Sequence, residues 1–232
     1  MAPTAASTWD WALAVLPFTA LITCIVTMVS CNLVSNYVPG QGNLLQVSHL
    51  SSGSSNIVFI VGLVLLLPQV LSIIIGRLLF LLQSQGLING IILHVSHLIS
   101  FVPFILFLIM GFVSSNRYTS TSTFVTYGIL GSFTLYCLIQ TVIVFYLFIR
   151  KSLGSVYSKV YIPIWFLVCT LILISFLIVW TQTREAIYGY IAAIAPFLYF
   201  LGFVPQFWTR ARSRKPYGVV STLERAADRI KK

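Results

Sequence analysis

The sequence predicts an all-α, polytopic membrane protein with six transmembrane helices in one bundle, and two observations predict this fold class. Six long apolar runs are separated by short polar breaks, and each run matches or exceeds the roughly 20 residues that a helix needs to cross a hydrocarbon core of about 30 Å. The 232-residue chain is 58% hydrophobic and only 8% charged, with a mean hydropathy of +0.97. Soluble domains are about one quarter charged, so a membrane environment explains the composition.

The six spans follow one another with little chain left between them. We expect them at residues 11–33, 57–82, 87–113, 124–149, 161–180 and 186–208. The runs lack the polar stripe of a soluble amphipathic helix, and barrel strands would be near ten residues long with alternating polarity. The first run is too long for the apolar core of a signal peptide, so we expect it to be retained. The predicted organisation is a leader over 1–10, one membrane domain over 11–208 and a basic tail over 209–232.

The basic residues are distributed unevenly between the two ends of the predicted bundle. The chain has a formal net charge of +10. The tail contains Arg210, Arg212, Arg214, Lys215, Arg225, Arg229, Lys231 and Lys232. Another three basic residues, Arg150, Lys151 and Lys159, lie between spans four and five, whereas the opposite loops contain only Arg117 and Arg184. Because basic loops stay on the cytosolic side, we expect both termini in the cytosol.

Polar groups inside the spans are few, and none is acidic. Asp and Glu are absent from the six runs, which argues against proton-coupled pumps and voltage sensors. Arg77 lies near the cytosolic end of span two, where we expect its side chain to snorkel to the headgroups. His94 and His97 lie three residues apart on span three, which we expect to place them on one helix face. In one interpretation they bind a lipid headgroup or a proton. In the other they form hydrogen bonds between helices.

Prolines occur in five of the six spans, and two of them precede glutamine. Pro68-Gln69 and Pro205-Gln206 resemble the dipeptides of the PQ-loop transporters, which makes a small-solute transporter one alternative. Gln69 is a candidate headgroup contact or an interhelical hydrogen-bonding residue. No metal-ligand spacing and no catalytic constellation are visible, so we expect no cofactor and no metal.

The first loop, over residues 34–56, is the largest feature on the predicted exoplasmic side. It is rich in Ser, Asn and Gly and has no charged residue. A simple connection would be shorter, and long loops on a rigid scaffold often bind ligands. We therefore expect specific recognition here, with Ser48, His49 and Gly53 as the candidate headgroup-binding residues.

Several short stretches carry a resemblance to a known family. They are Asn36-Tyr37-Val38-Pro39, Val47-Ser48 with Gly53, the span containing Pro68, Gly111–Ser115, and Arg150-Lys151. Together with the six-span layout, these stretches resemble the superfamily of the post-GPI-attachment factor 2 type proteins. That superfamily also contains the N-terminal domain of cell-wall remodelling proteins and the damage-regulated autophagy modulators.

The resemblance implies a protein that handles lipid in the secretory pathway, in the remodelling of GPI-anchor lipids. Its partners would be membrane lipids, including the GPI glycolipid, and no nucleic acid. Its compartment would be the Golgi apparatus or endoplasmic reticulum, with lysosome or plasma membrane as alternatives. We expect a lipid-binding or accessory factor rather than a self-sufficient enzyme.

A second hypothesis is a non-enzymatic regulator or scaffold of the autophagy-modulator or phosphoinositide-kinase-adaptor type. In that case anionic lipid or a cytosolic protein would bind the tail, through Arg210, Arg212, Arg214 and Lys215.

Overall fold

The computed structural model describes residues 5–36, 47–51, 53–82, 90–112, 119–150 and 159–212, and these residues form an all-α fold. The helices are α1 (Ala5–Asn36), α2 (Asn56–Leu82), α3 (Gly90–Ile99), α4 (Phe101–Phe112), α5 (Thr119–Arg150), α7 (Tyr161–Thr183), α8 (Ala186–Leu201) and α9 (Val204–Arg212). Two short 3-10 turns, η1 (Val47–His49) and η2 (Gly53–Ser55), lie between α1 and α2.

The described residues contain six segments that are long and apolar enough to cross a membrane. They are Trp9–Ser35, Gly53–Leu82, Leu93–Gly111, Thr121–Ile149, Tyr161–Thr183 and Ala186–Arg212. The chain is therefore a multi-pass integral membrane protein with six candidate spans. The helices α3 and α4 together form the third span, and α8 and α9 together form the sixth. The division into leader, membrane domain and tail stays a prediction.

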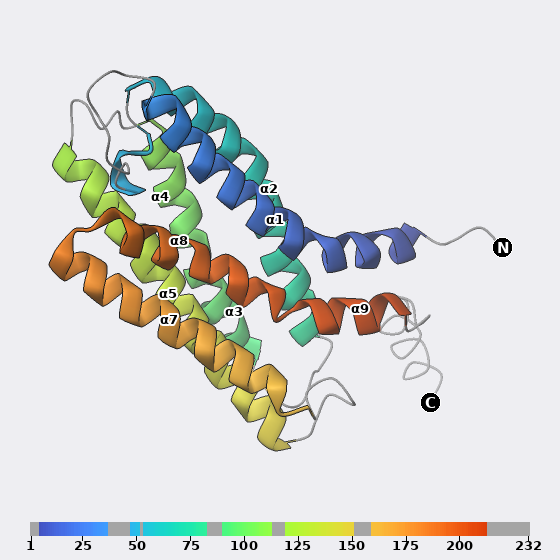
Figure 1. Cartoon of the computed structure of the whole chain (residues 1–232). Helices are drawn as coiled ribbons and strands as arrows, with labels where there is room; N and C mark the ends of the chain where they lie inside the picture. Colours follow the sequence, from blue (N-terminus) through green and yellow to red (C-terminus); the bar gives the residue numbers. More distant parts are fainter. Residues whose placement is uncertain are drawn as a thin grey trace, which may run out of the picture.

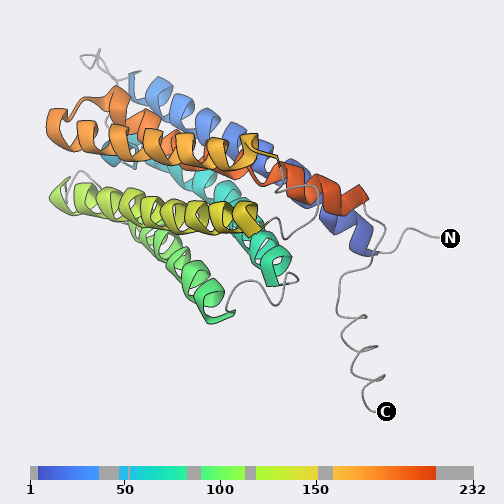
Figure 2. The ribbon, with the colours of Figure 1, turned by 90° about the horizontal axis from the view of Figure 1, so that it is seen from below.

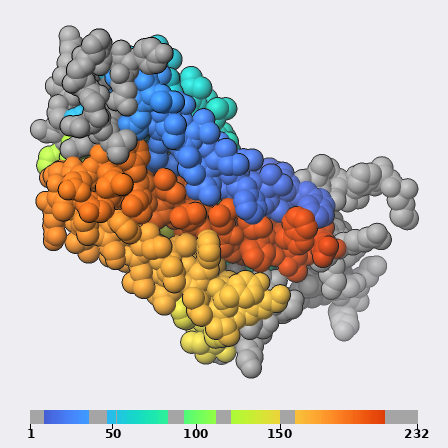
Figure 3. Space-filling model, in the orientation of Figure 1, coloured from blue at the N-terminus to red at the C-terminus, as the bar shows by residue number. Residues whose placement is uncertain are grey.

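The helices are arranged in two layers with α2 between them (Figure 1, Figure 2). One layer contains α1, α8–α9 and α7, and the other contains α5 and the pair α3–α4. In the space-filling view, α8–α9 lies between α1 and α7 (Figure 3). Small residues on α8, among them Gly189, Ala192 and Ala195, are buried there. Small side chains let membrane helices approach closely, which explains how the sixth span fits between two neighbours.

Prolines interrupt the third and sixth spans. Pro103 lies in the first turn of α4, and a proline both lacks an amide donor and clashes with the carbonyl four residues earlier. That carbonyl belongs to Ile99, the last residue of α3. Ser100 joins the two helices, with its amide donating to the carbonyl of His97 at 3.1 Å and its hydroxyl donating to the same carbonyl. Pro205 has the equivalent place at the start of α9, and the carbonyl four residues before it belongs to Leu201, the last residue of α8.

Two glycines permit close helix contacts that any side chain would prevent. A Cβ at Gly62 of α2 would overlap the side chain of Thr27 on α1. A Cβ at Gly202, between α8 and α9, would lie 2.6 Å from the ring of Phe166 on α7. In a bilayer, helices associate by close van der Waals packing rather than by removing apolar surface from water. These contacts therefore hold α1 to α2 and α7 to the sixth span.

The described part of the first loop folds onto one end of the bundle as a loop cap (residues 47–51 and 53–55). Its η1 turn contacts α5 and α8, and its η2 turn contacts α1 and α2. Val47, Leu50 and Ser55 are buried. The Ser55 hydroxyl donates to the carbonyl of Leu50 at 3.0 Å, which joins the two parts of the loop cap.

The start of α1 and the end of α9 lie together at the opposite end from the loop cap (Figure 1). Arg210 forms an ion pair with Asp10, with 3.2 Å between Nε and Oδ1. The rings of Trp11 and Trp208 pack edge to face with their centroids 4.9 Å apart. This common end agrees with an even number of spans, and its assignment to the cytosol stays a prediction.

Candidate functional site

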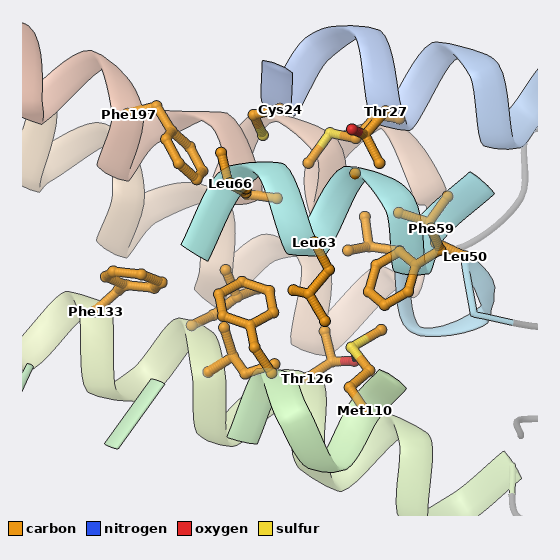
Figure 4. Close-up of a pocket in the computed structure, with 17 residues that line it drawn as sticks. Cys24, Thr27, Leu50, Phe59, Leu63, Leu66, Met110, Thr126, Phe133 and Phe197 are labelled. Carbon is orange, nitrogen blue, oxygen red and sulfur yellow. Dashed lines mark hydrogen bonds between the residues drawn. The ribbon is translucent and has the colours of Figure 1, made fainter. Parts of the chain in front are cut away.

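An apolar cavity of about 70 Å³ lies inside the bundle, in the half next to the loop cap (Figure 4). Side chains of α1, α2, α4, α5 and α8 line it. Val47 and Leu50 of the loop cap close one side of it. Its aromatic lining is Phe59, Phe107, Phe133 and Phe197. The first loop and the bundle interior therefore meet at this cavity.

The hydroxyl groups that line the cavity are used within their own helices. Thr27 donates to the carbonyl of Thr23 at 2.7 Å, and Thr126 donates to the carbonyl of Ser122 at 2.9 Å. The other lining residues are aliphatic, aromatic or sulfur-containing. A guest in the cavity would gain packing contacts and no strong hydrogen bond, so the cavity suits hydrocarbon. Its volume is below the roughly 150 Å³ of an apolar cavity that binds benzene, so its size matches a short stretch of hydrocarbon rather than a whole lipid.

Ser48 faces the bundle from the loop cap. Its side chain is fully buried, and its backbone carbonyl accepts a hydrogen bond from the hydroxyl of Ser122 on α5. Its own hydroxyl has no hydrogen-bond partner among the described residues. The contact with Ser122 fixes the loop cap to the start of the fourth span, directly above Thr126 of the cavity wall.

His49 and Gly53 lie at the outer part of the loop cap. His49 is half-buried, and this burial lowers the pKa of its imidazole below the usual 6.5 because the charged form loses solvation. Gly53 has a φ of +56° with open space around it. That left-handed conformation favours glycine, so the backbone conformation at the start of η2 explains why residue 53 is a glycine. Ser48 and His49 thus lie between the cavity-lining residues Val47 and Leu50, whereas Gly53 lies in η2, which contacts α1 and α2.

The structure separates the two histidines of the third span. His94 is exposed on α3, whereas His97 is only 2% exposed. Residues three apart on a helix differ by about 60° around its axis. The boundary between the buried and the exposed face of α3 falls between these two histidines. The His97 ring lies against Tyr136 of α5 with 6.0 Å between ring centroids, and its Nδ1 lies 2.8 Å from the carbonyl of Leu93.

Arg77 does not snorkel to the headgroups, and the expectation that it does is wrong. Its side chain is fully buried, it donates a hydrogen bond to the side-chain carbonyl of Gln206, and its guanidinium lies 4.8 Å above the ring of Phe203. The sixth span crosses α2 at this depth and supplies an acceptor and an aromatic face. A cation inside a bundle is stabilised by such groups.

A polar cluster surrounds the contact between α3 and α5, and we define it as Ser96, His97, Tyr136 and Gln140. The Gln140 amide donates to the hydroxyl of Ser96 at 3.4 Å. The charge of Arg77 on α2 acts on both His97 and Tyr136. All four members are at most 2% exposed. Sequence reasoning proposed His97 as a candidate, but it missed Tyr136, for which the one-turn spacing of Tyr136 and Gln140 was the available signal.

A second group of buried side chains, whose hydroxyls contact one another, joins α5, α7 and α8. Thr141 lies 3.0 Å from the hydroxyl of Thr170 and 3.1 Å from that of Tyr199. Tyr199 also donates to the carbonyl of Cys137 at 3.1 Å. Sequence reasoning missed this group, because isolated hydroxyl residues in apolar runs carry no period that marks them as neighbours.

The remaining candidates have separate places. Gln69 is half-buried, and its amide lies 3.3 Å from the hydroxyl of Thr23 on α1. Arg210 is half-buried in its ion pair with Asp10, whereas Arg212 is exposed and lies 5.8 Å from the ring of Trp208. The predicted tail contacts Arg214 and Lys215 lie outside the described residues.

Comparison with known proteins adds no family. No protein-family model, no curated protein and no solved structure matches the chain. Within the described residues, no three His, Cys, Asp or Glu side chains come together as a metal site. The cavity, the loop cap and the polar cluster are the features of the described residues that bear on function.

Proposed function

We propose that the chain handles membrane lipid, and that it does so by holding a short stretch of hydrocarbon chain in the apolar cavity. The cavity itself is the observation that carries this proposal. It lies within the membrane-spanning part, its hydroxyl groups are already hydrogen-bonded, and four phenylalanine rings line it. Lipid chains are the most abundant hydrocarbon around a membrane protein, and the cavity offers them a place with defined shape.

The narrower proposal is a role in remodelling the lipid of GPI anchors within the secretory pathway. It is supported by the resemblance of the first loop and of the span layout to the GPI-anchor remodelling proteins. The loop cap that carries part of this resemblance closes the cavity through Val47 and Leu50. We propose the endoplasmic reticulum or Golgi apparatus as the compartment, and an accessory or lipid-binding role.

The test is mass spectrometry of the lipids on GPI-anchored proteins from cells that lack the chain. These cells would be complemented with wild type, with Ala193→Leu, or with Ala186→Leu. Ala193 lines the cavity, so leucine there adds three carbon atoms to a space of about 70 Å³. Ala186 begins α8 away from the lining residues and serves as the matched control.

The proposal expects a changed acyl or ceramide composition without the chain, restoration by wild type and by Ala186→Leu, and little restoration by Ala193→Leu. An unchanged lipid profile in cells without the chain would reject the role in GPI-anchor remodelling. Full restoration by Ala193→Leu, at equal protein level, would reject the cavity as the working site.

The second candidate function is a non-enzymatic regulator or scaffold. It is favoured by the exposed Arg212 at the end of α9, within the predicted basic tail. Anionic lipid or a cytosolic protein would bind there. Deletion of residues 213–232 together with Arg212→Gln would abolish activity in this case, and would leave lipid remodelling intact if the cavity is the working site.

A further inference from the structure

Three buried polar atoms of the polar cluster have no hydrogen-bond partner among the described residues. They are Nε2 of His97, the hydroxyl of Tyr136 and Oε1 of Gln140. The three side chains are 2%, 0% and 0% exposed. Buried polar atoms are hydrogen-bonded in the great majority of cases, so three such atoms on neighbouring side chains indicate a missing partner.

The three side chains are neighbours at the contact of α3 with α5. The rings of His97 and Tyr136 are arranged edge to face, 6.0 Å apart. Tyr136 and Gln140 are separated by one turn on the same face of α5. The Gln140 amide reaches Ser96, the residue directly before His97, at 3.4 Å.

The hydrogen-bonding roles of these atoms define the missing partner. The Nδ1 of His97 faces the carbonyl of Leu93 at 2.8 Å. A carbonyl only accepts, so Nδ1 carries the proton, and Nε2 of the neutral ring presents a lone pair. The Gln140 amide group already donates to Ser96, which leaves its carbonyl oxygen as an acceptor. The Tyr136 hydroxyl both donates and accepts.

Two acceptors and one hydroxyl together fit a neutral hydroxyl group. A hydroxyl can donate to Nε2 or Oε1 and accept from Tyr136 at the same time. An anion would meet the lone pairs of two acceptors. An ammonium group would meet the positive field of Arg77, which acts on both His97 and Tyr136.

We propose that the polar cluster binds the hydroxyl group of a neutral lipid, such as a diacylglycerol, whose hydrocarbon part reaches the apolar cavity. This inference rests on the proposed function, because the cavity is the place for the chain. Phe133 lines the cavity and Tyr136 follows it on α5, about 4.5 Å further along the helix axis. The polar end of the lipid thus points away from the loop cap.

The experiment compares two photoactivatable diacylglycerol probes that differ only at the free hydroxyl. One probe keeps the hydroxyl, and the other carries it as a methyl ether. Both have a diazirine and an alkyne on one acyl chain, and both are added to the full-length protein in lipid nanodiscs. Labelled peptides are located by mass spectrometry, and labelling is measured for wild type, Tyr136→Phe, Tyr146→Phe and His49→Asn.

The inference expects wild type to be labelled about fivefold more by the hydroxyl probe than by the ether, the factor that one hydrogen bond provides. Tyr136→Phe removes the donor to the lipid oxygen and keeps the ring. Because both probes keep that oxygen, this variant would lower labelling by both, while the preference for the hydroxyl probe, which depends on donation to His97 or Gln140, stays. Tyr146→Phe makes the same change at a partly exposed position on the same helix and would leave labelling by both probes unchanged. His49→Asn would keep the preference.

Equal labelling of wild type by both probes would overturn the inference, since water would then satisfy the three atoms, and it would leave the proposed function standing. A preference that His49→Asn removes, together with unchanged labelling of Tyr136→Phe by both probes, would also overturn it, by assigning the hydroxyl to the loop cap. Absence of labelling by either probe would reject the proposed function together with the inference.

Discussion

Polar side chains find their hydrogen-bond partners differently in the two halves of the bundle. In the half next to the loop cap, the hydroxyl groups that line the cavity, such as that of Thr126, bond to carbonyls of their own helix, and the cavity between the helices is apolar. One amide at this end, that of Asn32, joins α1 to α8 by donating to the hydroxyl of Tyr190 at 2.6 Å. In the other half, Arg77, His97 and Gln140 have side chains that extend beyond their own helices, and they contact groups on neighbouring spans.

This difference indicates where side-chain hydrogen bonds connect the spans around the cavity and where they do not. A hydroxyl that bonds to its own helix connects nothing else, whereas a guanidinium or amide that contacts another span ties the two together. The contact of Arg77 with Gln206 joins the second span to the sixth. The contact of Gln140 with Ser96 joins the fourth to the third. We expect the polar half to hold the bundle together and the apolar half to admit a guest.

The largest expected effect on stability is that of Gln206→Leu. This substitution removes the side-chain carbonyl that accepts a hydrogen bond from the buried Arg77 guanidinium, and a hydrogen bond to a charged group contributes about 2 kcal/mol. The free energy of unfolding, measured by steric trapping in bicelles, should fall by about that amount. The double variant Arg77→Met/Gln206→Leu should lose less than the sum of the two single variants. Additive losses would show that the two side chains are not coupled.

The next largest expected effect on stability is that of Gly62→Ala. The added methyl group would overlap Thr27 where α1 meets α2, and such overpacking costs about 1–2 kcal/mol. Gly131→Ala is the matched control, because nothing lies within 4 Å of a Cβ there. It should leave the melting temperature unchanged or raise it, since alanine favours a helix over glycine. A melting temperature that responds equally to both substitutions would contradict the close α1–α2 contact.

A smaller effect is expected for Gln69→Leu, the counterpart of Gln206→Leu in the other Pro-Gln dipeptide. Gln69 is half-buried and its contact with Thr23 is 3.3 Å long. Interhelical hydrogen bonds of this neutral kind contribute about 0.6 kcal/mol on average. Measured in the same bicelles, Gln69→Leu should therefore be clearly milder than Gln206→Leu. If the two dipeptides had equal effects, the contrast between the two halves would not hold.

The smallest effect is a pH dependence of the loop cap. Burial lowers the pKa of His49 in the folded state below 6.5, so the unfolded state binds the proton more readily. Stability should therefore be complete above about pH 6.5 and should decline as the pH falls below it, until His49 is also protonated in the folded state. His49→Asn should remove this part of the decline. Melting curves between pH 7.5 and 5 test it, and parallel curves for both proteins would exclude the contribution.

The sequence was sufficient to predict the six spans, because the length and apolarity of each segment can be judged without knowing which other segments pack against it. Pro103 and Pro205 lie in the predicted spans, and they mark where the third and sixth spans are divided. The inward faces could not be predicted in the same way. A helix that is apolar all round has no polar stripe to mark its interior side, so nothing in the run around Arg77 indicates that another span covers it.

The candidate residues illustrate the same limit. The three-residue spacing of His94 and His97 predicted a common face, but the edge of a helix contact falls between them. Tyr136 was missed because it becomes significant only beside His97, which is far away in the sequence. The loop residues were identified from length and composition, and their position beside the cavity depends on the packing of Val47 and Leu50.

The most direct test of the central claim is native mass spectrometry of the purified full-length protein after exchange into a detergent that strips annular lipid. The account predicts that wild type and Ala186→Leu retain a lipid with a hydrocarbon chain, and that Ala193→Leu, which fills the cavity, does not. Equal lipid retention by all three proteins would contradict the cavity as the lipid site. Absence of retained lipid from wild type under conditions where the protein stays folded would contradict it as well.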